Sequence, residues 1–345
     1  LFVSLPVTGL MLSYHLAAPI EGDAQLFHRM AADWPWRPPG WWRYRVLVPW
    51  VVSVLPLATR AGYALVALVA VTAGGPLVSL LLRDLGHGAA ARNAGVLLYL
   101  CCFAPLYNTY NHVMPDPAAM AVLLLAARAL ARKRDRELAL WLAVGVVTKE
   151  VTLFLLPARW LYARRKGLDL PEVGRTALVG LPALAVLLGL RFLSEGPDQL
   201  VSMATGTAWL FPWLHQDDNV ARLYSPFAAG WALALLGCRR PDRWTIAGLG
   251  FAVPVLLSLL VTDAGRMLIY LLPFASPAMV RAANVATPTT RKRGLWAVAL
   301  AALSMRLWEP FLPLALIPEL ARRAAALLLF PVVAWLAPGV PRGED

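Results

Sequence analysis

The chain alternates between long apolar runs and short polar breaks. Runs such as Ala61–Leu82 and Ala177–Leu190 are almost entirely apolar and show no strict alternation of apolar and polar residues. A membrane-spanning strand alternates over about ten residues, whereas a membrane-spanning helix needs about 20 mostly apolar residues. The pattern therefore predicts helices rather than strands.

Twelve apolar segments are candidate membrane spans. They cover residues 2–20, 61–82, 93–109, 117–131, 138–148, 151–162, 176–193, 224–238, 245–261, 266–281, 295–307 and 311–337. The segments 138–148 and 151–162 are too short to cross a bilayer straight, so they are expected as half-helices or as parts of longer helices. We expect an all-α polytopic membrane protein with about nine to twelve spans, forming one domain over residues 1–345 with no soluble domain.

The composition argues against a soluble globular protein and against a nucleic-acid binder. Hydrophobic residues make up 59% of the chain and charged residues only 15%, whereas a soluble globular protein carries about 25% charged residues. The net charge of +12 would suit a nucleic-acid binder, but the Lys and Arg residues lie between the apolar runs and form no single patch in the sequence.

The basic residues also predict an orientation. Five polar stretches on one side of the predicted spans hold 19 of the 32 Lys and Arg residues, namely 83–92, 128–136, 159–175, 239–243 and 281–293. The positive-inside rule assigns this side to the cytoplasm. The opposite side then holds a first outer loop at 21–60 and a longer outer loop at 194–222.

The first outer loop carries candidate chemistry. Asp23 follows the first span and is either the N-cap of a short helix beginning at Ala24 or a general base at the membrane surface. Arg43 and Arg45 lie in a Trp-rich stretch that forms an aromatic belt or contacts a lipid phosphate. Residues 46–58 are apolar but too short to span, so we expect a helix lying in the interface.

Three further polar pairs come at the outer ends of apolar runs: His112 with Asp116, Lys149 with Glu150, and Asp263 with Arg266. Each has two interpretations. Asp116 is a helix N-cap or a titratable site residue, Lys149–Glu150 is a structural ion pair or a site, and Asp263–Arg266 is a hairpin clamp or a phosphate contact. The predicted topology brings all of them to one face, which is typical of a binding pocket.

The order of these parts resembles the GT-C superfamily of polytopic glycosyltransferases, in particular bacterial mannosyltransferases and arabinosyltransferases that use polyprenyl-phosphate sugars. The resemblance covers roughly residues 1–270. The elements that carry it are Asp23 after the first span, the Arg43-Tyr44-Arg45 start of the interfacial helix, Pro115-Asp116-Pro117, Thr148-Lys149-Glu150 and the Asp263–Arg266 turn.

The resemblance implies an inverting sugar transfer on the outer, periplasmic side of a bacterial inner membrane, with Asp23 as the catalytic base. It implies a polyprenyl-phosphate sugar donor, an acceptor of unknown identity and surrounding membrane lipids as partners. The residues implied in substrate binding are Glu21, Arg43, Arg45, His112, Asp116, Lys149, Glu150, Asp263 and Arg266. A divalent cation, Mg or Mn, bridging Asp23 and Asp116 is compatible with oxygen ligands but is not required.

Two departures from the superfamily pattern stand beside the resemblance. Many members have adjacent carboxylates in the first outer loop, whereas Gly22 separates Glu21 from Asp23, and many carry a soluble outer domain that is not expected here. Two other classes remain as alternatives: a secondary transporter with carboxylate proton sites, and a non-catalytic membrane or lipid-binding protein. A transporter predicts matching broken spans in two halves, and the sequence indicates a single break, near 148–150.

Overall fold

The computed structural model describes residues 4–15, 20, 23–35, 44–164, 169–192, 219–258, 267–285, 287–309 and 317–339. Every regular element within these ranges is helical. The N-terminal half contains α1 (Ser4–His15), α2 (Asp23–Ala32), α3 (Leu47–Val54), α4 (Thr59–Asp84), α5 (Ala89–Cys101), α6 (Phe103–Tyr110), α7 (Asp116–Ala131), α8 (Asp135–Thr148), the 3-10 helix η2 (Glu150–Phe154) and α9 (Leu155–Ala163). The C-terminal half contains α10 (Leu170–Phe192), α12 (Asn219–Tyr224), α13 (Gly230–Cys238), α14 (Arg243–Ser258), the 3-10 helix η5 (Ile269–Leu271), α16 (Leu272–Ala283), α17 (Pro288–Trp308) and α18 (Glu319–Leu336).

The all-helical class predicted from the apolar runs is confirmed over the described residues. The predicted run 61–82 lies within α4, and the run 176–193 coincides with most of α10. The short apolar stretch 46–58 forms α3, which has only 8 residues. Hydrophobic runs located these helices because burial of apolar surface, rather than local propensity, stabilises most helices in proteins.

The predicted number of membrane spans is not reproduced. Among the described helices, only α4 and residues 170–190 of α10 are long and apolar enough to cross a bilayer. The pair α5 and α6, bent by 41° at Cys102, makes a third if it is one broken span. Most other helices are shorter: α7, with 16 residues, is about 24 Å long, against a hydrocarbon core of about 30 Å. The apolar runs were therefore better guides to helices than to spans.

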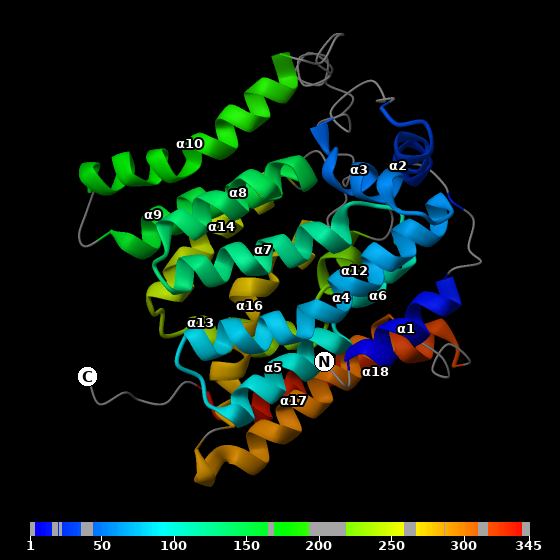
Figure 1. Ribbon diagram of the computed structural model, residues 1–345. Coiled ribbons are helices and arrows are strands. Elements are labelled where there is room, and N and C mark those ends of the chain that lie inside the picture. Colours follow the sequence, from blue (N-terminus) through cyan, green and yellow to red (C-terminus); the bar gives the residue numbers. More distant parts are fainter. Residues whose placement is uncertain are drawn as a thin grey trace.

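The helices pack closely at small residues. In Figure 1, α4 crosses the middle of the molecule, and it packs against α5 and α7. The Tyr99 hydroxyl of α5 lies against Gly74 of α4 and donates a hydrogen bond of 2.8 Å to the Val71 carbonyl. A side chain at position 74 would occupy the space of the Tyr99 ring, so glycine permits this approach. α10 lies along one edge of the molecule (Figure 1), where it packs against α8 and α9. Several of its leucines are exposed.

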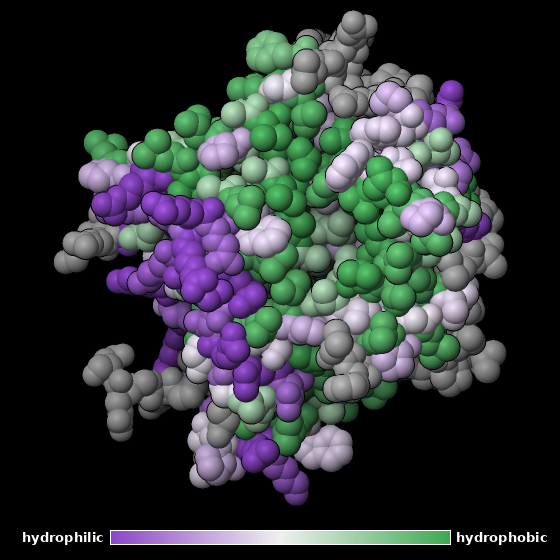
Figure 2. Space-filling view, in the orientation of Figure 1, coloured by the Kyte–Doolittle hydropathy of each residue, from purple (hydrophilic) through white to green (hydrophobic). Residues whose placement is uncertain are grey.

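The basic stretches predicted to share one side do lie together. One cavity joins the α7–α8 turn with α9, the start of α10 and the start of α14. A second, smaller cavity joins the α4–α5 turn with the start of α14 and the end of α16. An ion pair of 2.9 Å between Arg128 and Asp84 links the ends of α7 and α4. Figure 2 shows polar residues gathered toward the left, where α9 and α13 lie in Figure 1, with apolar residues beside them. We call this region the basic end; it contains the residues around the two cavities, among them Lys133, Arg159, Arg243 and Arg281.

Candidate functional site

A buried polar cluster joins three distant parts of the chain. Lys149 Nζ lies 2.7 Å from Asp116 Oδ1, and the Tyr270 hydroxyl donates a hydrogen bond of 2.7 Å to the same oxygen. The ammonium also lies 4.9 Å from the centre of the Tyr270 ring. The side chains of Asp116 and Lys149 are only 0% and 5% exposed, so this ion pair is sealed from solvent.

A second ion pair begins at the next residue. Arg45, just before α3, donates two hydrogen bonds to the Glu150 carboxylate, from Nε at 3.0 Å and from Nη2 at 2.5 Å. Two parallel bonds between a guanidinium and a carboxylate fix both distance and orientation. The Arg45 side chain is 5% exposed, but that of Glu150 is 37% exposed, so this pair is accessible from solvent on the Glu150 side.

The backbone at Lys149 separates the two pairs. Helix α8 ends at Thr148, and Lys149 has φ −166° and ψ 127°, an extended conformation. Successive side chains on an extended backbone point to opposite sides. Lys149 therefore reaches Asp116 at the start of α7, while Glu150 reaches Arg45 in the first outer loop. The break after α8 sits against Gly145, where the Thr152 side chain leaves no room for a larger residue.

Two sequence-based interpretations are corrected by this geometry. Lys149 and Glu150 were considered as partners of each other, but each pairs with a residue far away in sequence. Asp116 was considered as an N-cap, but Pro115 occupies that position and provides no side-chain cap. Asp116 is the first residue of α7, and its carboxylate accepts hydrogen bonds from Lys149 and Tyr270 instead.

Helix α2 begins at Asp23, one residue earlier than predicted, and Asp23 is half-buried. The following turns place Phe27 and Met30 in a small apolar cluster with residues of α3, α4 and the turn before α7, including Val113 and Met114. The Tyr63 hydroxyl of α4 donates to the Phe27 carbonyl at 2.6 Å. The helix that carries Asp23 is therefore packed against the turn that leads into Asp116.

His112, in the turn between α6 and α7, is 4% exposed. Neither of its ring nitrogens has a hydrogen-bond partner, and the nearby Asn108 Oδ1 is also buried without one, among the residues that the structure describes. Burial lowers the pKa of His112 below its ordinary value, and the charge of Arg60 lowers it further. His112 is therefore favoured as a neutral imidazole.

Four of the predicted site residues, Glu21, Arg43, Asp263 and Arg266, lie outside the described residues, as does most of the predicted outer loop 194–222. The structure brings together Arg45, Asp116, Lys149 and Glu150, whose convergence on one face was expected from the topology. Sequence reasoning missed Tyr270. The available signal was a single tyrosine near the start of the apolar run 266–281, which by itself resembles an interfacial aromatic residue.

The residues present do not favour a divalent cation at Asp116. Lys149 and Tyr270 already direct two donors at one oxygen of this carboxylate. Within the described ranges, no group of three or more His, Cys, Asp or Glu side chains is arranged to hold a metal ion. The groups that the structure places at this site are ion-paired side chains and carboxylates.

Comparison of the chain with protein families, curated proteins and solved structures finds no match.

Proposed function

We propose that this chain is a polytopic glycosyltransferase of the inner membrane that transfers a sugar from a polyprenyl-phosphate donor to an acceptor hydroxyl on the outer side. Asp23 acts as the general base. The observation that carries the proposal is the convergence of ion-paired side chains from separate loops, Arg45–Glu150 and Asp116–Lys149, away from the basic turns. Convergent polar groups on an apolar scaffold are the usual form of a small-molecule site.

The two ion pairs have different tasks in this proposal. The Asp116–Lys149 pair is sealed and holds the start of α7 to the end of α8, so it positions the site. The Arg45–Glu150 pair is partly open, and the donor phosphate competes with the Glu150 carboxylate for the Arg45 guanidinium. A guanidinium matches the geometry of a phosphate as well as that of a carboxylate.

The reaction is a single inverting displacement. The acceptor oxygen forms a bond to the anomeric carbon while the bond from that carbon to the phosphate oxygen breaks, and the polyprenyl phosphate leaves with the electron pair. Asp23 takes the proton of the attacking hydroxyl. Arg45 stabilises the charge that develops on the phosphate.

The test uses purified protein in lipid vesicles supplied with a panel of polyprenyl-phosphate sugars and acceptor glycans. We expect turnover by the wild type and a loss of at least about 100-fold for Asp23→Asn, the low end for general-base catalysis. Asp33→Asn is the matched control, because Asp33 follows the same helix and makes an exposed ion pair with Arg29. It should retain full activity.

Arg45→Gln tests whether Arg45 contacts the donor phosphate in both the bound state and the transition state. It should raise the KM for the donor as well as lower kcat, because Arg45 contacts the phosphate both before and during transfer. Equal turnover by the wild type and Asp23→Asn would remove Asp23 from the mechanism. Absence of turnover by the wild type with every donor would refute the glycosyltransferase assignment.

A further inference from the structure

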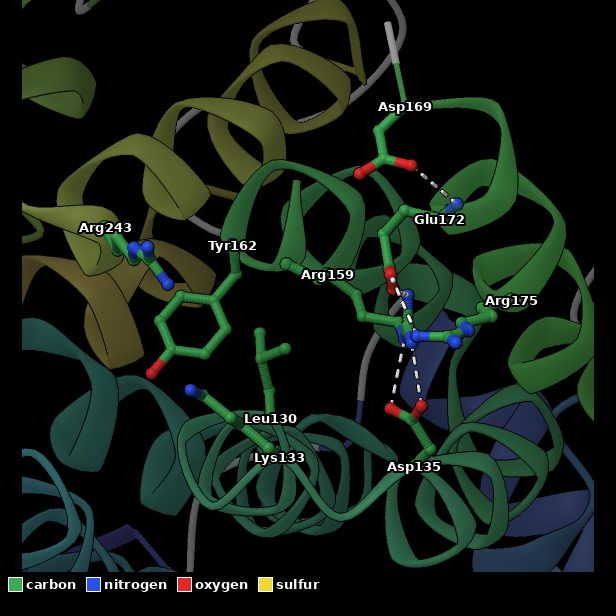
Figure 3. A pocket seen from close by; sticks show the side chains of 10 residues that line it. Leu130, Lys133, Asp135, Arg159, Tyr162, Asp169, Glu172, Arg175 and Arg243 are labelled. Carbon is green, nitrogen blue, oxygen red and sulfur yellow. Dashed lines mark hydrogen bonds and ion pairs between the residues drawn. The ribbon is translucent and has the colours of Figure 1, made fainter. Parts of the chain in front are cut away.

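A cavity of about 830 Å³ lies at the basic end and shares no lining residue with the candidate site. It is enclosed by the α7–α8 turn, α9, the start of α10 and the start of α14 (Figure 3). Four cationic and three carboxylate side chains line it, together with Tyr162. The proposed sugar transfer uses none of them.

The carboxylates in the wall are already engaged. Arg159 is 3% exposed, and its guanidinium holds Asp135 through two hydrogen bonds of 3.2 and 2.7 Å. The same guanidinium donates to Glu172 at 2.6 Å and to Thr176 at 2.7 Å. Asp169 accepts a hydrogen bond of 3.2 Å from the Glu172 backbone N–H at the start of α10. This network uses four of the five N–H groups of Arg159, so Arg159 serves mainly to hold the wall of the cavity together.

Two of the lining cations are not engaged. Lys133 and Arg243 are exposed, and neither side chain has an ion pair or hydrogen bond within the part of the chain that the structure describes. Figure 3 shows the Lys133 amine and the Tyr162 hydroxyl directed toward each other, with Arg243 on the other side of the tyrosine. Within the described ranges, the Tyr162 hydroxyl donates one long hydrogen bond, of 3.5 Å to the Ala131 carbonyl. Two cations and a hydroxyl that converge in this way suit a phosphate group.

An apolar surface begins at the rim of this cavity. Leu170 and Val173 lie on either side of Glu172 and are 66% and 41% exposed. Farther along α10, Leu178 and Leu181 are 69% and 58% exposed. Among the described residues, the stretch 170–190 is one of two helices long and apolar enough to cross a membrane, and only 22% of its 18-residue apolar window is buried. A ligand with a charged head and an apolar tail could place its head in the cavity and its tail against the exposed apolar face of α10.

We propose that this cavity binds the phosphate head group of an anionic membrane phospholipid from the leaflet at the basic end. Lys133 and Arg243 bind the phosphate, the Tyr162 hydroxyl donates a hydrogen bond to it, and the acyl chains lie along the exposed face of α10. Basic pockets between helices on the cytoplasmic side are suited to such head groups. The inference rests on α10 crossing the membrane, which is part of the proposed function, but not on sugar transfer.

The experiment titrates detergent-solubilised, delipidated full-length protein with phosphatidylglycerol and counts bound lipids by native mass spectrometry. The test variant is Lys133→Gln/Arg243→Gln. The matched control is Arg291→Gln/Lys292→Gln, which removes the same charge from exposed residues at the start of α17. A cation near an anionic lipid surface contributes about fivefold to binding, so the test variant should bind roughly 25-fold more weakly. The control should bind like the wild type.

Further arms distinguish the possible ligands. Phosphatidylcholine with the same acyl chains should bind more weakly than phosphatidylglycerol, and millimolar inorganic phosphate should not displace the lipid. The conservative variant Lys133→Arg/Arg243→Lys should restore retention. Equal retention by the test and control variants would overturn the proposal, as would displacement by inorganic phosphate, which would mark a site for a free anion. Since binding is read without turnover, these outcomes are independent of glycosyltransferase activity.

Discussion

Removing Lys149 should destabilise the protein far more than removing an exposed cation. Lys149→Met keeps an unbranched side chain of similar length but deletes the ammonium 2.7 Å from the fully buried Asp116 carboxylate. Breaking a buried ion pair by removing one partner costs about 3–5 kcal/mol. The Tyr270 hydroxyl donates to the same oxygen in both the wild type and the variant, so the Asp116 charge that remains is partly compensated. We therefore expect a loss near the lower end of that range, about 3 kcal/mol.

Equilibrium unfolding by denaturant in detergent micelles measures this loss. Arg29→Gln is the control, because its ion pair with Asp33 has side chains 62% and 57% exposed. Such pairs contribute about 0.2–1 kcal/mol. Asp116→Asn combined with Lys149→Met removes both charges yet keeps an oxygen acceptor for Tyr270. The double variant should recover at least about 2 kcal/mol of the loss seen in Lys149→Met, as expected for directly coupled residues.

A loss for Lys149→Met no larger than that for Arg29→Gln would refute the reasoning. It would mean that Asp116 is not sealed and that water replaces the ammonium without cost. An additive double variant would also contradict it, since directly paired charges do not behave independently.

Three other substitutions test different parts of the fold. A Cβ at Gly294 would overlap the Ala283 carbonyl oxygen, so Gly294→Ala should lower the free energy of unfolding by about 1–3 kcal/mol. Gly174 has open space around it, so Gly174→Ala should raise the free energy of unfolding by about 0.5–1 kcal/mol. Equal effects of the two substitutions in denaturant titrations would contradict the close approach of α17 to α16. Arg159→Lys cannot reproduce the fork of hydrogen bonds to Asp135 and Glu172, so its melting temperature should fall clearly below that of Arg134→Lys, whose exposed pair is worth little. The folded protein holds the pKa of His112 below its ordinary 6.5, so the unfolded chain binds more protons as the pH falls, and stability should decline from about pH 7 down toward that lowered pKa. In His112→Gln this decline should become shallower, with the remainder due to His87, whose pKa burial also lowers. An unchanged profile would show that His112 protonates freely in the folded state.

The sequence predicted where helices lie better than how far each one extends. The run 61–82 is continuous and contains no charge, and it became the long helix α4. The run 93–109 looked equally continuous, yet the structure bends it by 41° at Cys102, between α5 and α6. Hydrophobicity reports which residues avoid water, not whether consecutive residues keep one helical axis. Such breaks are one reason why the sequence overestimated the number of membrane spans among the residues that the structure describes.

The candidate site was predictable as a set of residues but not as a set of contacts. Charged residues at the edges of apolar runs singled out Asp116 and Lys149, because such charges are costly unless paired. The pairing itself joins positions 33 residues apart, and the Tyr270 contact spans 154 residues. Partners at these separations depend on how helices pack, which no local pattern records. The adjacency of Lys149 and Glu150 was even misleading, because the extended backbone directs them apart.

The extended backbone at Lys149 places two consecutive side chains, those of Lys149 and Glu150, in contact with two different parts of the chain. Displacement of Arg45 from Glu150 would break the ion pair at Glu150 but leave the ion pair between Lys149 and Asp116 intact. Because Lys149 and Glu150 are joined by one peptide bond, we expect a change at the solvent-accessible pair to alter the geometry of the sealed pair. A spectroscopic probe near Tyr270, although remote in sequence from Arg45, should register the arrival of an anion there.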